Sequence, residues 1–229
     1  MERIFNMDNK FFTFMGRVAD LVILNLLCVV CCLPVVTAGA SVTAMFYVTL
    51  KMARNEESYI LRSFFKSFKE NFKQAAIINI IMLLAAIMLY FDLSISRNIE
   101  GTLGTVMVFV FMVILLLYLM LFIYIYPVLA KFYNSIRNTF TNAFLMSIRH
   151  LPYTLLMIVI SVLPLAVFFI PSAQIQSTAI MLLILLGFST VAYINSRFLV
   201  KIFDNYIPKE EDENPNRSGE LPDSQSSSL

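Results

Sequence analysis

Four long apolar runs without a charged residue constrain the fold of this chain more than any other feature. They extend over Leu21 to Leu50, Gln74 to Phe91, Thr102 to Ala130 and Leu151 to Ser196. A transmembrane helix needs about 20 apolar residues, so each run can cross a bilayer once or twice. Only 14% of the chain is charged, against about 25% in a typical soluble domain. The sequence therefore predicts an all-α, polytopic helical bundle surrounded by the lipid bilayer.

The basic residues predict the orientation of this bundle. All but one of the 17 lysines and arginines fall on a single side of the membrane if the runs make an even number of crossings, and the exception is Arg97. Loops on the cytoplasmic side of membrane proteins are enriched in lysine and arginine. We therefore expect a protein of the bacterial cytoplasmic membrane with both termini in the cytoplasm.

Six spans satisfy this orientation. Residues 1–206 are expected to form a membrane domain with spans at about 20–33, 39–52, 74–91, 103–130, 151–170 and 177–196. Residues 207–229 are acidic, polar and poor in large apolar side chains, which is typical of disorder. This segment is expected to be a disordered cytoplasmic tail.

The first run is divided by a turn. Proline, threonine, glycine and serine concentrate between Leu33 and Ser41, and a straight helix through Pro34 would lose a backbone hydrogen bond. Two short helices forming a hairpin would return the chain to its starting side. The candidate structural turn consists of Pro34, Thr37, Gly39 and Ser41. The hairpin can cross the bilayer fully or be re-entrant. Although small residues at the turn resemble a secretory cleavage site, the run stays apolar to Leu50 and we expect it to be retained.

The loop before the third span is amphipathic. Between Tyr59 and Lys73, apolar residues recur at helical spacing and basic residues occupy other faces. Such a helix is expected to lie in the membrane interface. It could also form a docking surface, and its candidate partner-facing residues are Arg62, Phe65, Lys66, Phe68, Lys69, Phe72 and Lys73. The segment from Phe132 to Arg149 has a similar pattern.

These two segments belong to a weak internal repeat. Leu61-Arg62 matches Ile136-Arg137, and Leu129-Ala130-Lys131-Phe132 matches Leu199-Val200-Lys201-Ile202. Each unit would contain an interfacial helix, an outward span and an inward span. Two parallel repeats of this kind occur in transporters.

Polar residues at membrane depth are neutral in this sequence. Asn25 and Asn79 can form hydrogen bonds between helices or line a polar cavity, and both interpretations stay open. Tyr124 and Tyr126 approach the end of a span, where tyrosine is enriched at the membrane surface. Pro164 lies inside the fifth span and should distort it.

The sequence lacks a set of residues suited to catalysis or metal binding. Cys28, Cys31 and Cys32 lie in the first apolar run, without a second C-x-x-C pair, and His150 is the only histidine. We interpret the cysteines as apolar packing residues. No metal, no cofactor and no enzymatic activity are expected. Nucleic-acid binding is not expected either. The basic residues flank membrane spans, where the anionic lipids of the cytoplasmic leaflet account for them.

The residues Leu33-Pro34-Val35-Val36-Thr37-Ala38-Gly39-Ala40-Ser41, together with the segment Phe64 to Gln74, carry a family resemblance. The chain resembles the YesL family of bacterial multi-pass membrane proteins, a domain of unknown function. The resemblance implies a Gram-positive cytoplasmic-membrane protein, in a family often encoded beside ATP-driven carbohydrate importers. It implies a non-enzymatic accessory or regulatory component associated with carbohydrate uptake, with importer subunits as partners. The alternative is a small-solute transporter built from the two parallel repeats.

Overall fold

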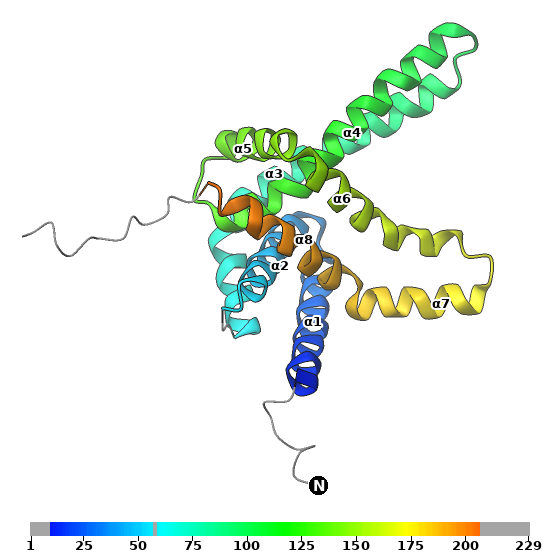
Figure 1. Cartoon of the computed structure of the whole chain (residues 1–229). Coiled ribbons are helices and arrows are strands. Elements are labelled where there is room, and N and C mark those ends of the chain that lie inside the picture. The colour runs from blue at the N-terminus through cyan, green and yellow to red at the C-terminus, as the bar shows by residue number, and fades with distance from the viewer. Residues whose placement is uncertain (1–9, 57–58, 207–229) are drawn as a thin grey trace, which may run out of the picture.

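The computed structural model describes residues 10–56 and 59–206 of the chain and contains only helices over these residues (Figure 1). Six described segments are long and apolar enough to cross a membrane: Phe12–Cys32, Val35–Ala53, Ile60–Arg97, Thr102–Lys131, Leu151–Phe169 and Ala173–Phe203. The prediction of an all-α bundle with about six spans is confirmed. The tail predicted over residues 207–229 lies outside the described residues.

Eight α-helices and three short segments of other helical geometry make up the fold. The α-helices are α1 (Lys10–Cys32), α2 (Ala38–Ala53), α3 (Ile60–Arg97), α4 (Thr102–Lys131), α5 (Ile136–Arg149), α6 (Leu151–Val162), α7 (Ala173–Leu182) and α8 (Phe188–Phe203). The 3₁₀ segments are η1 (Val35–Thr37) and η2 (Leu163–Phe169), and the π segment is η3 (Leu183–Gly187).

Helix α2 lies at the centre of the bundle because small side chains cover much of its surface. It packs against α1, α3, α4 and α8. Ala40, Ala44 and Val48 are fully buried. Small residues allow helix backbones to approach closely, which favours packing inside a membrane. The most buried helix of the fold is therefore the second arm of the predicted hairpin, which follows the turn at Pro34.

Two helical hairpins project from this core. One consists of the outer parts of α3 and α4, and the other of α6, η2 and α7 (Figure 1). Their apolar side chains are widely exposed, as Met88, Phe109 and Leu163 show at 66%, 71% and 68%. Apolar surface this extensive is typical of a protein that contacts membrane or partner protein. The hairpins thus have the surface expected of lipid-facing spans.

The structure differs from the expected repeat where each amphipathic segment meets its span. Helix α3 runs from Ile60 to Arg97 without a break, a length of roughly 57 Å at 1.5 Å per residue. In the second unit α5 ends at Arg149 and α6 starts anew at Leu151. Pro152 lies in the first turn of α6, where a proline is tolerated because its missing N–H is not needed. Helix α3 has no proline, so its amphipathic part continues directly into the span.

The second hairpin departs from α-helical geometry twice. The α-helix gives way to the 3₁₀ segment η2 at Leu163, next to Pro164, which confirms the predicted distortion of this span. On the returning arm of the hairpin, the π segment η3 follows α7 and precedes α8. Neither irregular segment contains a buried residue, and π segments inside helices are often found at functional sites.

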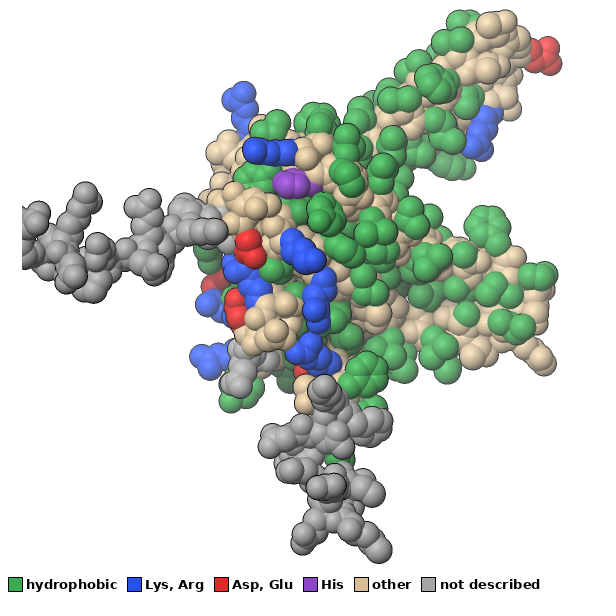
Figure 2. Space-filling view, in the orientation of Figure 1, with side chains coloured by type: hydrophobic (Ala, Val, Ile, Leu, Met, Phe, Trp, Pro, Cys, Tyr) green, Lys and Arg blue, Asp and Glu red, His purple; other side chains and the backbone are tan. Residues whose placement is uncertain are grey.

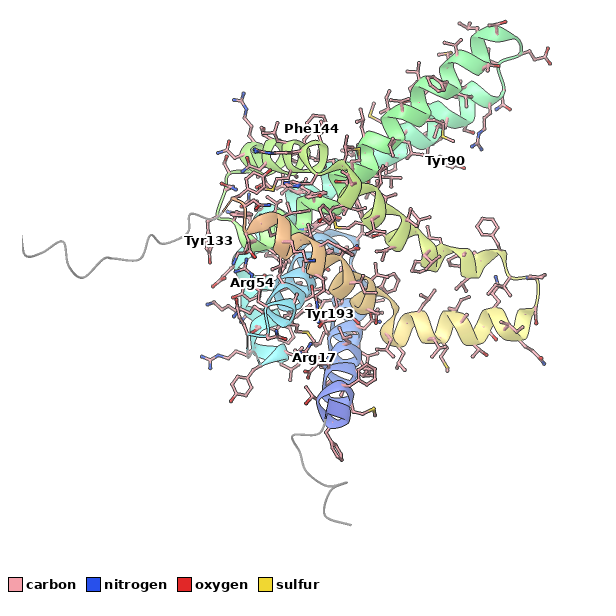
Figure 3. The ribbon with its side chains drawn as sticks, in the orientation of Figure 1. Arg17, Arg54, Tyr90, Tyr133, Phe144 and Tyr193 are labelled. Atoms are coloured by element: carbon pink, nitrogen blue, oxygen red, sulfur yellow. The ribbon has the colours of Figure 1, made fainter. Side chains whose placement is uncertain are left out.

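Polar contacts fasten the helices together at the basic end of the molecule. Figure 2 shows most lysine and arginine side chains gathered there, and Figure 3 shows Arg17 close to Tyr193. Arg17 donates hydrogen bonds to the Tyr193 hydroxyl at 3.0 Å and to Asn55 Oδ1 at 2.6 Å. Arg54 forms an ion pair with Asp204. These contacts join α1 and α8 to the turn after α2.

Candidate functional site

The exposed side of the amphipathic part of α3 combines aromatic and basic side chains. We call it the α3 basic-aromatic face, and it consists of Arg62, Phe65, Lys66, Phe68, Lys69, Phe72 and Lys73. All of these residues are exposed except Phe68, which is half-buried. Phe68 and Phe72 lie with ring centroids 5.6 Å apart. The face therefore presents a row of rings beside four cations.

The aromatic residues of this segment divide between two environments. Phe64 is fully buried in the core, and its ring centroid lies 6.1 Å from that of Phe68. Phe65 and Phe72 are 43% and 38% exposed. The inner rings hold α3 against the bundle, which leaves the outer rings free to contact lipid or protein.

The predicted turn is organised by Thr37. Its hydroxyl contacts the carbonyl oxygens of Cys31 and Pro34, at 2.6 and 2.8 Å. The Ser41 hydroxyl in turn donates to the Thr37 carbonyl at 3.0 Å. The contact with Cys31 satisfies a carbonyl at the end of α1, where the helix can no longer supply an N–H partner. The turn thus joins two helices without leaving these carbonyls unpaired in an apolar environment.

Gly39 and Asn79 fix this turn against α3. A Cβ atom on Gly39 would lie 2.6 Å from the Ala75 carbonyl oxygen and 2.7 Å from Asn79 Cβ, so only glycine fits without displacement. Asn79 Nδ2 donates to the Val35 carbonyl at 2.8 Å, and its Oδ1 accepts from the Tyr126 hydroxyl at 3.1 Å. Asn79 therefore bridges the turn and α4.

Two tyrosines are placed differently from the sequence-based expectation. Tyr124 and Tyr126 were expected at the membrane surface, but they are 0% and 2% exposed, so that expectation is wrong. The Tyr124 hydroxyl lies 3.0 Å from Thr154 Oγ1. A position near the end of a span does not determine which way a side chain faces, and here both rings turn inward.

The hydrogen bond from Tyr126 to Asn79 should stabilise the fold. Substitution Tyr126→Phe removes one hydrogen bond to the Asn79 amide and should lower the free energy of unfolding by about 1 kcal/mol. Thermal unfolding of the purified protein, followed by circular dichroism, measures this effect. Tyr90→Phe is the control because Tyr90 is 70% exposed on the α3–α4 hairpin (Figure 3). Equal stability of the two variants would contradict a stabilising bridge.

Asn25 occupies a contact between α1 and the π segment η3. Its side chain is fully buried. Nδ2 donates to the Ile184 carbonyl at 2.5 Å, and Oδ1 accepts from the Ser189 backbone N–H at 2.7 Å. The regular hydrogen-bond ladder is interrupted where π geometry changes to α geometry, and Asn25 supplies partners to backbone groups there. Asn25 and Asn79, the candidates for a polar cavity, are thus both engaged in contacts between elements.

A cavity of about 340 Å³ lies between α2, α4, the α6–η2 segment and the segment from η3 into α8. We call it the central cavity. Its lining includes the polar residues Tyr126, Ser161 and Asn195 and otherwise mostly apolar side chains. Asn195 is 2% exposed, its Nδ2 donates to Ser161 Oγ at 2.9 Å, and its Oδ1 has no partner among the described residues. A buried polar atom without a partner costs about 1–3 kcal/mol.

The sequence indicates two polar residues of this cavity but not the contact between them. Ser161 and Asn195 are recognisable as polar residues inside apolar spans, but residues that lie 34 positions apart were not expected to meet. Their contact depends on the packing of α6 against α8. A polar residue in a span is therefore a signal for a contact, and the partner comes from the fold.

The three cysteines lie near the turn at Pro34 and are free thiols. Cys28 is buried in the core, and its Sγ lies 3.8 Å from Cys32 Sγ. Within the described parts of the chain, no three His, Cys, Asp or Glu residues are grouped so that they could hold a metal ion. The three cysteines make the contacts of packing residues with weak sulfur hydrogen bonds.

The fold and these sites define a multi-pass helical membrane protein. Residues 21–93 match the family described as "Protein of unknown function, DUF624". The matched region begins in α1, contains the turn and α2, and ends in the outer part of α3. It includes both the turn fixed by Gly39 and the α3 basic-aromatic face. No curated protein and no solved structure matches the chain.

Proposed function

We propose that this protein is a non-enzymatic accessory or regulatory component that binds a membrane partner through the α3 basic-aromatic face. In this proposal the basic end of the bundle, with both termini, lies in the cytoplasm of a Gram-positive bacterium. The orientation follows from the enrichment of basic residues on that side. The α3 face would then meet partners at the cytoplasmic surface of the membrane.

The observation that carries the proposal is the exposure of Phe65 and Phe72 beside four cations. Exposed aromatic rings and arginine are enriched at protein interfaces and often dominate their binding energy. The face occupies the part of α3 that extends beyond the length of an ordinary span. The anionic lipids of the cytoplasmic leaflet would attract the same cations, which would concentrate the protein and its partner at one surface.

The partner class comes from the family resemblance. We propose the permease or ATP-binding subunits of ATP-driven carbohydrate importers, because members of the resembling family are often encoded beside such importers. A permease subunit presents both apolar helices and cytoplasmic loops. It therefore offers one surface for the exposed rings and another for the basic side chains.

Affinity capture from native membranes tests the proposal. The tagged protein should recover importer subunits in comparable amount in mild detergent. The double variant Phe65→Ser, Phe72→Ser should lower this recovery by about tenfold, since it removes two exposed rings and leaves all cations in place. Tyr90→Ser is the control because Tyr90 is 70% exposed and lies on the outer part of α3, away from this face (Figure 3). Recovery of the wild-type protein alone would contradict the proposal, and so would equal recovery by the double variant.

The central cavity favours a second candidate, a small-solute transporter built from two helical repeats. Its walls come from α4 in the first repeat and from α6 and α8 in the second, as a path between repeats would require. Substrate-dependent flux into proteoliposomes would support this function. Flux should then fall in Asn195→Leu, which changes the cavity lining, and stay unchanged in Asn98→Leu, which changes an exposed residue at the tip of the first hairpin. Absence of flux for a panel of sugars and amino acids would contradict it.

A further inference from the structure

We infer that the central cavity binds a neutral amphiphile from the bilayer, with an apolar chain and a hydroxyl or amide N–H group that donates to the site at Asn195. This inference goes beyond the proposed docking function and does not depend on the α3 basic-aromatic face. It concerns a ligand of the isolated protein, and it is tested without any partner protein.

The volume and lining of the central cavity fit such a ligand. Four elements contribute to the lining: α2 with Val42, Met45 and Phe46, α4 with Phe122, Ile123 and Tyr126, the α6–η2 segment with Ser161, Pro164 and Leu165, and the segment from η3 into α8 with Gly187, Phe188, Val191, Ala192 and Asn195. None of these lining residues carries a charge. Small-molecule sites in proteins are mostly apolar cavities with a few polar groups that orient the ligand, and a volume of about 340 Å³ falls in their usual range.

Asn195, one of the few polar residues of the lining, lacks a hydrogen-bond donor to its side-chain oxygen within the described parts of the chain. Asn195 has a buried carbonyl oxygen without a partner among the described residues, while its amide nitrogen already contacts Ser161 Oγ. The nearby Tyr126 hydroxyl is used by Asn79 Oδ1. Binding includes a rotation of the buried Asn195 amide that turns its oxygen toward the ligand. A hydroxyl or an amide N–H supplies the missing donor, whereas an anion would meet an acceptor and no cation.

The surroundings of the cavity indicate that the ligand comes from lipid. Leu165 borders the central cavity and also a second hollow on the outer side of α6 and η2. That hollow is lined only by apolar residues, among them Val159 and Phe169, which are 62% and 87% exposed. An apolar surface of this kind faces acyl chains in a membrane. The side chain of Leu165 therefore stands between the bilayer and the cavity.

Photolabelling of the full chain in lipid nanodiscs tests the inference. The probe is a decanol analogue with a diazirine in its chain, and labelled peptides are identified by mass spectrometry. Labels should concentrate on peptides of the central cavity that contain Phe46, Leu165 or Ala192. Free 1-decanol should compete about tenfold better than methyl nonyl ether, which has the same length but cannot donate a hydrogen bond.

Two outcomes would overturn the inference. One is labelling confined to the outer surfaces of the hairpins, and the other is equal competition by the alcohol and the ether. In Asn195→Leu the preference for the alcohol should disappear, whereas in Asn205→Leu, at the exposed end of α8, it should be kept. Circular dichroism establishes that each variant is folded. The comparison of the two competitors uses the wild-type protein, so it remains decisive even if Asn195→Leu does not fold.

Discussion

Replacing Asn25 by leucine is expected to lower the free energy of unfolding by about 3 kcal/mol. The substitution removes the donor to the Ile184 carbonyl in η3 and the acceptor of the buried Ser189 N–H in α8, and both backbone groups lose this partner. Each buried polar group that loses its partner costs about 1–3 kcal/mol, and no water is available in an apolar environment to replace the amide. The apolar side chain has a similar size, so loss of hydrogen bonds should dominate the effect.

Thermal unfolding in detergent measures this loss. The chain contains no tryptophan, so circular dichroism is a better signal than intrinsic fluorescence. A loss of 3 kcal/mol corresponds to a fall in Tm of roughly 9 °C for a protein of this size. Asn98→Leu is the control, because Asn98 is exposed and donates only within its own hairpin tip, to the Ser94 carbonyl. A shift in Asn25→Leu no larger than that of the control would show that the π segment does not need the Asn25 amide.

Replacing Gly39 by alanine is expected to destabilise the protein by about 2 kcal/mol. The added methyl group would lie 2.6 Å from the Ala75 carbonyl oxygen, which belongs to the α3 backbone and cannot move as a flexible side chain could. Overpacking of a close contact typically costs 1–3 kcal/mol because backbone must shift. Alanine is otherwise a better helix former than glycine by about 1 kcal/mol, so the steric effect must exceed this gain.

Gly16→Ala provides a control with the opposite expected sign. Gly16 lies in α1, and an added Cβ would have no neighbouring atom within 4 Å. Alanine at this position should therefore stabilise the helix by about 0.5–1 kcal/mol. Comparison of the two Tm values under the same conditions isolates the packing effect. Stabilisation by both alanines would mean that α2 and α3 can separate at Gly39 without loss.

The architecture follows from the sequence to a large extent, because the physical requirement behind it is local. A helix that crosses a bilayer satisfies its own backbone, so an uncharged apolar run predicts a span without knowledge of its neighbours. Pro34 predicts the turn for a similar reason, since a proline removes a hydrogen bond inside its own helix. The signal at Pro164 is of the same kind, and the helix changes geometry beside it.

The faces of the helices were harder to predict. The aromatic residues between Tyr59 and Lys73 have one helical spacing, yet Phe64 is buried and Phe65 is exposed. Within lipid, an apolar side chain has almost the same preference for a neighbouring helix as for acyl chains. Hydrophobic periodicity therefore loses its power to distinguish inside from outside, and the burial of Tyr124 and Tyr126 escaped prediction for this reason.

The sequence by itself determined the class of this protein, the number of its membrane-crossing segments and the place of its first turn. Only the tertiary structure decided that α2 is the central helix, that Asn25 serves the π segment, and that Ser161 and Asn195 meet beside a cavity. The physical reason is the range of the interactions involved. Backbone hydrogen bonds and apolar run lengths act within one segment, whereas close packing and hydrogen bonds between helices depend on residues far apart in the chain.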